Sequence, residues 1–175
     1  MSLDHLWAGW RNAYVTGATA GEAAGGPGPD APEGCVFCRL AASGPPAATT
    51  GVLWRGEATF GVLNAYPYTN GHLMVVPVRH VGALDELTAG ESAELWAALR
   101  AGVAAIEAAY RPEGVNLGAN LGRAAGAGIP RHLHLHALPR WAGDTNFMTS
   151  VAGARVMPES LEDSWHRLAP AWPPG

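Results

Sequence analysis

The longest regular hydrophobic pattern in the chain lies between residues 89 and 110. Apolar residues recur there every three or four positions, which is the period of an α-helix with one buried face. The members of this stripe are Leu95, Leu99, Val103, Ile106 and Tyr110. Thr88 and Glu91 are spaced as a capping box at the start, and Pro112 with Gly114 ends the pattern. The sequence therefore predicts one long helix over residues 89–110.

Short apolar runs on both sides of this helix are bounded by glycine, proline and polar turn residues, which is typical of β-strands. The predicted strands cover residues 51–55, 59–63, 72–76, 115–120 and 133–138. Three strands, a long helix and two further strands predict an α+β domain with a mainly antiparallel sheet.

Composition along the chain predicts three regions. Residues 1–34 comprise a short segment with helix-like apolar spacing at residues 3–14 and a flexible linker of glycine, alanine and proline. Residues 35–148 form the domain. Residues 149–175 form a C-terminal tail that we expect to pack on it.

Composition also excludes several classes of protein. The 175 residues carry a formal net charge of −4, which argues against nucleic-acid binding through bulk positive charge. All eleven basic residues are arginine, so enzymes that need a lysine amine are excluded. No apolar run approaches the roughly 20 residues of a membrane span, and no signal peptide is visible. With only two cysteines, Cys35 and Cys38, a cytoplasmic location fits best.

Three histidines alternate with apolar residues near the end of the domain. In a strand, this alternation places His132, His134 and His136 on one face, with imidazoles roughly 6.5–7 Å apart. The apolar residues that alternate with them, on the other face, are Leu133, Leu135 and Ala137. A histidine row suits metal ligation or nucleophilic attack on phosphorus, and the spacing alone does not choose between them. The alternative is a half-buried strand whose polar face is histidine.

The segment at residues 132–138 resembles the His-φ-His-φ-His-φ-φ signature of the histidine-triad (HIT) nucleotide hydrolases and transferases. The resemblance covers most of the chain. It includes Cys-x-Phe-Cys at residues 35–38, Gly-His-Leu-Met-Val-Val-Pro at 71–77, Asn-Leu-Gly-Ala-Asn at 116–120 and Pro-Arg-Trp at 139–141. It is greatest to the branch of bacterial diadenosine tetraphosphate (Ap4A) phosphorylases and related hydrolases, and it implies a HIT-like fold.

The resemblance implies a role for each histidine. His134 would be the nucleophile that takes up a nucleoside monophosphate, and His136 would contact the phosphate and support proton transfer to the leaving group. His132 completes the catalytic row. The implied reaction is cleavage of Ap4A or a similar substrate through a nucleotidyl-histidine intermediate, with phosphate or water as acceptor. A nucleoside phosphoramidase and a non-catalytic nucleotide-binding regulator remain alternatives.

By the same resemblance, Asn64 corresponds to a ribose-binding position and Asn120 to a position near the phosphates. The alternative for Asn64 is a turn residue. Glycines in the loop before the histidines can offer backbone N–H groups to phosphate oxygens. The loop residues assigned to nucleotide binding are Gly126, Gly128, Ile129 and Pro130. Gly128 and Ile129 replace a Gln and a Ser of commoner branches, and Arg131 replaces an expected acidic residue.

Cys35 and Cys38 could be half of a zinc site or a redox pair. A redox pair is expected where a helix follows a strand, whereas this pair follows a linker-like segment, which disfavours that interpretation. The resemblance implies that His80 and His132 complete a structural zinc site. The alternative for His80 is a histidine at a strand end. His72 is left unassigned, with burial near the site and a structural role as the two expectations.

HIT proteins usually pair through their long helix and a neighbouring strand, so the resemblance also implies a homodimer or a larger assembly. Trp96 and Ala104 lie off the buried stripe and could face a partner. The alternative is that Trp96 packs under the linker of its own chain. The expected partners are therefore a nucleotide substrate, phosphate as a co-substrate and a second copy, with neither nucleic acid nor membrane.

Overall fold

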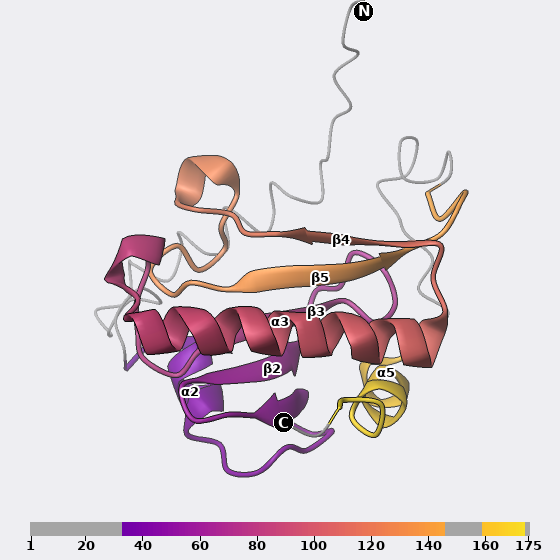
Figure 1. The fold of residues 1–175 in the computed structure, drawn as a ribbon, viewed down its shortest axis with the longest axis horizontal. Coiled ribbons are helices and arrows are strands. Elements are labelled where there is room, and N and C mark those ends of the chain that lie inside the picture. Colours follow the sequence, from indigo (N-terminus) through magenta and orange to yellow (C-terminus); the bar gives the residue numbers. More distant parts are fainter. Residues whose placement is uncertain (1–32, 146–158, 174–175) are drawn as a thin grey trace, which may run out of the picture.

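The structure is a computed structural model, and it describes residues 33–145 and 159–173. Five antiparallel strands form one sheet in the order β1-β2-β3-β5-β4 (Figure 1). The strands are β1 (Val52–Arg55), β2 (Thr59–Leu63), β3 (Leu73–Pro77), β4 (Gly114–Gly118) and β5 (Leu135–Arg140). The helices are α2 (Val36–Ala41), α3 (Ala89–Tyr110) and α5 (Leu161–Leu168), with 3-10 turns η2 (Leu84–Glu86) and η3 (Arg123–Ala125). The predicted α+β fold with one long helix is confirmed.

Helices cover both faces of the sheet. On one face lie α3 and α5, and α2 lies on the opposite face (Figure 1). The core between α3 and the sheet includes Leu73, Val75, Leu95, Leu99, Ile106, Leu133, Leu135 and Ala137. The smaller core beneath α2 comprises Cys35, Phe37, Val52, Phe60, Val62, Met74 and Val76. The residues between the three histidines therefore face α3, as their alternation predicted.

Helix α3 has the predicted bounds. The Glu91 backbone N–H donates to the Thr88 hydroxyl, and the Thr88 N–H donates to the Glu91 carboxylate, so the predicted capping box is confirmed. Of the predicted stripe, Val103 and Tyr110 are half-buried and the other members are buried. The helix ends at Arg111, whose positive φ of 45° reverses the chain before Pro112.

Two helices escaped prediction. α2 spans six residues, too few for a hydrophobic period to stand out. α5 begins at Ser160, which accepts a hydrogen bond from the Asp163 backbone N–H, and it carries Leu168 into the core. After α5, the Trp172 ring stacks on Trp54 with ring centroids 5.6 Å apart.

Strand bounds near the histidines differ from the prediction. β5 begins at Leu135 and not at Leu133, so His132 and His134 precede the strand. The reason is a loop contact, because the Leu133 backbone N–H donates to the Val81 carbonyl at 2.6 Å instead of to a neighbouring strand. β4 ends at Gly118, two residues earlier than predicted, and β3 runs from Leu73 to Pro77.

In the described part of the chain, no helix is both long enough and apolar enough to cross a membrane. The predicted segment at residues 3–14 and almost all of the predicted linker lie outside the described residues.

Candidate active site and metal cluster

His134 lies immediately before β5, and one of its ring nitrogens is hydrogen-bonded to the main chain. Its Nδ1 is 2.8 Å from the His132 carbonyl oxygen, which only accepts, so Nδ1 carries the proton and donates it. The other nitrogen, Nε2, is then the one with a free electron pair. Burial lowers the pKa of His134, against the effect of the hydrogen bond to His132, and this favours the neutral ring. A neutral imidazole with Nε2 unprotonated is the form that acts as a nucleophile.

His136, on β5, is joined to a second buried histidine. His72 Nε2 lies 2.9 Å from His136 Nδ1, and the Tyr68 backbone N–H donates to His72 Nδ1 at 3.2 Å. Since His72 Nδ1 accepts, His72 Nε2 carries the proton and donates it to His136. His136 then carries its own proton on Nε2, and among the described residues this buried nitrogen has no hydrogen-bond partner. The site therefore places a donor on His136 beside a bare nitrogen on His134.

Burial keeps this histidine pair neutral. Burial, followed by the nearby His136 and His134 rings, lowers the pKa of His72 to about 3. Burial and the His134 ring lower the pKa of His136 to about 4. Near neutral pH both rings therefore hold a single proton each, and the hydrogen-bond chain from Tyr68 to His136 keeps one direction.

The histidine rings are closer than the strand spacing predicted. The ring centroids of His134 and His136 are 5.0 Å apart at an interplanar angle of 76°, against the expected 6.5–7 Å. The expected value follows the rise of an extended backbone, whereas the two rings meet edge to face and lean together. One phosphate group can therefore contact both rings.

Of the predicted nucleotide-binding residues, Asn64 contacts a histidine of this site. The Asn64 side chain accepts from the Tyr66 backbone N–H at 2.9 Å, as its turn interpretation expects, and its amide nitrogen lies 3.3 Å from His72 Nδ1. Gly118 pairs with His136, so Asn120 follows β4 towards His134. In the loop, Gly126 has a positive φ of 92° and Ile129 packs against the core beneath α2. Gly128 lies between these two residues, and Pro130 lies in the turn between Ile129 and the histidines.

The four predicted metal ligands lie close together at the start of the histidine row, which His132 begins. The sulfurs of Cys35 and Cys38 and one nitrogen each of His80 and His132 all lie within 4.8 Å of one another. His132 Nδ1 is 3.3 Å from Cys35 Sγ and 3.6 Å from Cys38 Sγ, and His80 Nδ1 is 3.2 Å from Cys38 Sγ. Bond lengths of about 2.0–2.3 Å around tetrahedral zinc give ligand separations of about 3.3–3.8 Å. The donor set and its spacing thus fit zinc.

The tautomer of His132 agrees with this fit. His132 Nε2 is 2.8 Å from the Pro77 carbonyl oxygen and donates to it, which leaves the lone pair of Nδ1 directed at the two sulfurs. Burial and the neighbouring Cys35 raise the pKa of the Cys38 thiol to about 11, so a bound cation is needed to hold it as thiolate near neutral pH. Cys35 is the N-cap of α2, so the pair opens a helix that the sequence did not predict.

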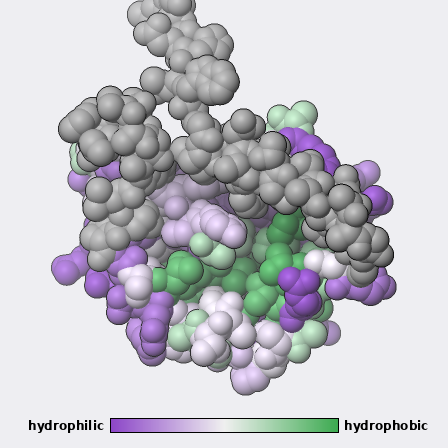
Figure 2. All heavy atoms as spheres, turned by 180° about the vertical axis from the view of Figure 1, so that it is seen from behind, coloured by the Kyte–Doolittle hydropathy of each residue, from purple (hydrophilic) through white to green (hydrophobic). Residues whose placement is uncertain are grey.

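Main-chain contact joins the metal ligands to the histidine row. A Cβ atom on Gly82 would lie 3.1 Å from Arg131 Cα, so glycine allows the chain after His80 to lie against the chain before His132. Arg131 itself is exposed. Seen from the side opposite α3, hydrophobic residues gather in the middle, with hydrophilic residues to the left and right of them (Figure 2).

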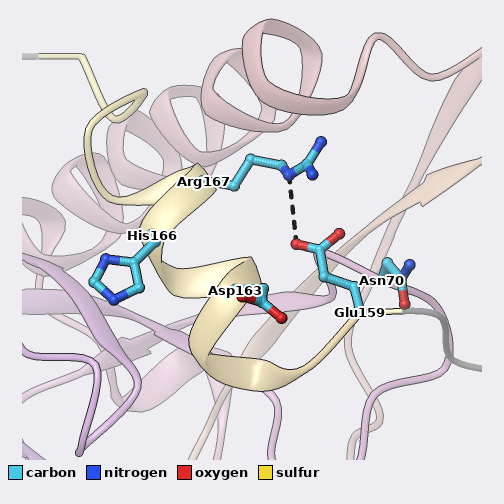
Figure 3. Close-up of a pocket in the computed structure, with 5 residues that line it drawn as sticks. All are labelled: Asn70, Glu159, Asp163, His166 and Arg167. Atoms are coloured by element: carbon cyan, nitrogen blue, oxygen red, sulfur yellow. Dashed lines mark ion pairs between the residues drawn. The ribbon is translucent and has the colours of Figure 1, made fainter.

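A hollow lies beside α5. It is lined by Asn70, Glu159, Asp163, His166 and Arg167, and Arg167 faces Glu159 at 3.5 Å (Figure 3). The Glu159 carboxylate also accepts from the Tyr110 hydroxyl at 2.8 Å. These contacts attach the start of α5 to the end of α3, a structural role.

Comparison with known proteins decides the family. The HIT domain family model matches residues 47–143, more than half of the chain. The chain belongs to the HIT family. Among HIT proteins, it is 48% identical over 121 residues to an AP-4-A phosphorylase of Mycobacterium tuberculosis, covering 69% of this chain and 62% of that protein.

Two further HIT proteins inform the site. A bis(5'-nucleosyl)-tetraphosphatase of Schizosaccharomyces pombe is 32% identical over 53% of this chain and 50% of its own length. A zinc-bound histidine triad protein of Mycobacterium smegmatis has a similar solved structure, with a TM-score of 0.63 and 30% identity over 81% of this chain and 95% of that one.

Sequence reasoning assigned His72 no role, and the structure places it against His136 as described above. A signal was available, since His72 follows Gly71 at the start of a buried strand, where a lone polar residue needs a partner. The identity of that partner, 64 residues away, depends on the pairing of β3 with β5.

Proposed function

We propose that the protein cleaves dinucleoside polyphosphates, with Ap4A as the preferred substrate, through a nucleotidyl-histidine intermediate on His134. The observation that carries this proposal is the pair of complementary tautomers. His134 directs a proton-free Nε2 to the site while His136 offers the N–H of its own Nε2 there. A binding module has no need for a bare nucleophile beside a proton donor.

In the proposed reaction, His134 Nε2 forms a bond to the phosphorus that bears the first nucleoside. The bond from that phosphorus to the bridging oxygen breaks, and ATP leaves. The N–H of His136 stabilises the charge that develops on the phosphate oxygens and on the departing group. His72 is a positioning residue in this scheme, because its hydrogen bond keeps the proton of His136 on the nitrogen that faces the substrate.

The second half-reaction differs only in the acceptor. Phosphate attacking the adenylyl-histidine gives ADP, and water gives AMP. The similarity to an AP-4-A phosphorylase at 48% identity supports phosphate, and the similarity to a tetraphosphatase at 32% supports water. Incubating the purified protein with Ap4A, with and without phosphate, tests the proposal. We expect ATP with ADP or with AMP, and no turnover in either condition would overturn it.

We further propose a structural zinc at Cys35, Cys38, His80 and His132. Its support is the ligand geometry, together with a zinc-bound protein of similar structure. Bound zinc would fix the His132 ring, whose own carbonyl oxygen orients His134. Zinc thiolates require reduced cysteines, which supports a cytoplasmic location.

We also propose a homodimer formed at β4. The two edges of the sheet differ among the described residues. At the β1 edge, the Val52 carbonyl accepts from the Trp165 indole N–H at 2.7 Å. At the β4 edge, Leu117 is 51% exposed, and Trp96 on α3 is 57% exposed. An open edge flanked by exposed apolar side chains favours pairing with a second copy.

The dimer has a direct test in light scattering at micromolar concentration. We expect at least twice the mass of one chain, and Trp96→Glu should shift the population towards monomer, because it places a charge in a desolvated contact. The mass of a single chain for the wild-type protein would contradict the proposal.

A further inference from the structure

A small cavity lies on the same side of the sheet as the histidines, beyond His136. Its volume is about 180 Å³, and it is bounded by the loop between β2 and β3 and by strands β4 and β5. The lining residues are Tyr68, Thr69, Asn116, Leu138, Arg140 and Asp144. None of them belongs to the nucleotide-binding set that the sequence suggested.

The cavity shares a wall with the reacting groups. The Tyr68 ring lies against the His136 ring with centroids 6.3 Å apart, and the same ring lines the cavity. Leu138 and Arg140 follow His136 at alternate positions of β5, so they face the same side of the sheet. Every two residues of an extended chain advance it by roughly 6.6 Å. Leu138, at the near end of the cavity, therefore lies roughly 13 Å along the chain from His134.

This direction is that of the leaving group. In the proposed function, His134 attacks the first phosphorus and His136 stabilises the group that departs. The departing arm therefore passes His136, and its remaining three phosphates carry the second nucleoside away from His134 over a comparable distance. The cavity lies along that path.

The charge of the cavity suits a nucleoside and not a phosphate. Arg140 donates to Asp144 from Nε at 2.5 Å and from Nη2 at 2.8 Å, so the two charges compensate each other. The Arg140 hydrogen bonds hold the pKa of the Asp144 carboxyl well below its usual range. Arg140 Nη1 also donates to the Asn116 side-chain oxygen at 2.7 Å, which leaves the Asn116 NH₂ group as a donor at the cavity wall.

We propose that this cavity binds the second nucleoside, which leaves as part of ATP, and so selects dinucleoside substrates. The inference rests on the proposed function. Tyr68 forms part of the cavity wall, and Thr69 and Asn116 offer neutral polar groups to a base or ribose. A substrate without a second nucleoside does not reach these residues.

Two substrates with the same reacting half test the proposal. Ap4A carries the second nucleoside, and the 4-nitrophenyl ester of AMP does not. We expect Asn116→Leu and Thr69→Val to raise KM for Ap4A about fivefold while leaving kcat/KM for the ester within about twofold. Thr69→Val serves as the second variant because no side-chain bond of the Arg140 network includes Thr69.

Asn70→Leu is the matched control. It makes the same chemical change as Asn116→Leu and lies in the same loop as Thr69, but Asn70 lines the hollow beside α5 (Figure 3), so neither substrate should be affected. Equal losses with both substrates, or no change with either, overturn the cavity proposal while Ap4A cleavage stands. Cleavage of the ester without any cleavage of Ap4A by the wild-type protein overturns the proposed function and this inference with it.

Discussion

Two histidine pairs flank His134 at nearly the same spacing, and they differ in what surrounds them. The ring centroids of His80 and His132 are 5.0 Å apart, and those of His72 and His136 are 5.1 Å apart. His132 donates from Nε2 to a carbonyl and turns Nδ1 towards two sulfurs. His136 accepts at Nδ1 from another imidazole and keeps its proton on Nε2. The same type of side chain thus presents a lone pair to two sulfurs at one end and a proton donor at the other, and the neighbours decide which.

The comparison depends first on His134, which stands between the two pairs. We expect His134→Ala to lower kcat for Ap4A by at least about a thousandfold, since a covalent step has no substitute. Nucleotide binding, measured by calorimetry, should survive because Asn64, Asn120 and the loop are unchanged. Retention of more than about a tenth of the wild-type rate would contradict the assignment.

The second prediction removes a ligand at the sulfur end. Cys35→Ser should abolish stoichiometric zinc in elemental analysis and lower the melting temperature, because a structural zinc contributes folding free energy. His72→Asn serves as the control at the other end and should retain zinc at the wild-type level. Equal zinc in wild type and Cys35→Ser would refute the metal assignment.

The third prediction removes the support at the proton-donor end. His72→Asn cannot accept from the Tyr68 N–H and also reach His136, so His136 loses its fixed tautomer. We expect kcat to fall about ten- to a hundredfold, with little change in KM. The pH dependence of kcat should shift as well, and an unaltered kcat and pH profile would leave His72 with a purely structural role.

The smallest predicted effect concerns stability against pH. In the folded protein the pKa values of about 3 for His72 and about 4 for His136 keep both rings neutral, whereas in the unfolded chain they take up protons below about pH 6.5. The unfolded state therefore binds more protons below pH 6.5, and stability falls as the pH drops from there towards 4.

At pH 5.5 each of these two histidines should cost on the order of 1 kcal/mol of unfolding free energy relative to pH 7. Denaturant titrations at the two pH values measure the loss. His72→Asn lacks one of the two groups, so it should lose less stability than the wild-type protein over the same interval. An identical loss in both proteins would show that His72 does not titrate as described.

Sequence predicted well what depends on local period and residue type. The bounds of α3 came from its apolar period together with its capping box and the proline that follows it, and the shared face of Leu133, Leu135 and Ala137 came from alternation. The distance between the His134 and His136 rings was not predicted correctly. It depends on side-chain torsion angles, whereas the prediction used only the rise of the backbone. Likewise, the late start of β5 depends on the Val81 carbonyl, which lies far away in the sequence.

The candidate site divides in the same way. The four metal ligands were expected from a resemblance, and the structure brings their atoms together. The partner of His136 was not expected, because it depends on the alignment of β3 with β5, a tertiary property. Similarly, the sequence contains the serine N-cap of α5, but the mostly polar residues of this short helix give no clear apolar period. Its contact with the core is made by Leu168, and this contact is a tertiary property.

His132 performs its two tasks with different parts of the residue. Its ring faces the sulfurs, while its main-chain carbonyl orients the neighbouring His134. Every amino acid has that carbonyl, so the second task survives any substitution that keeps the backbone in place. In evolutionary terms, a lineage that lost the proposed zinc through a change at position 132 would still keep the contact that orients His134. The proposed metal site and the proposed catalysis could therefore diverge independently, although they meet in one residue.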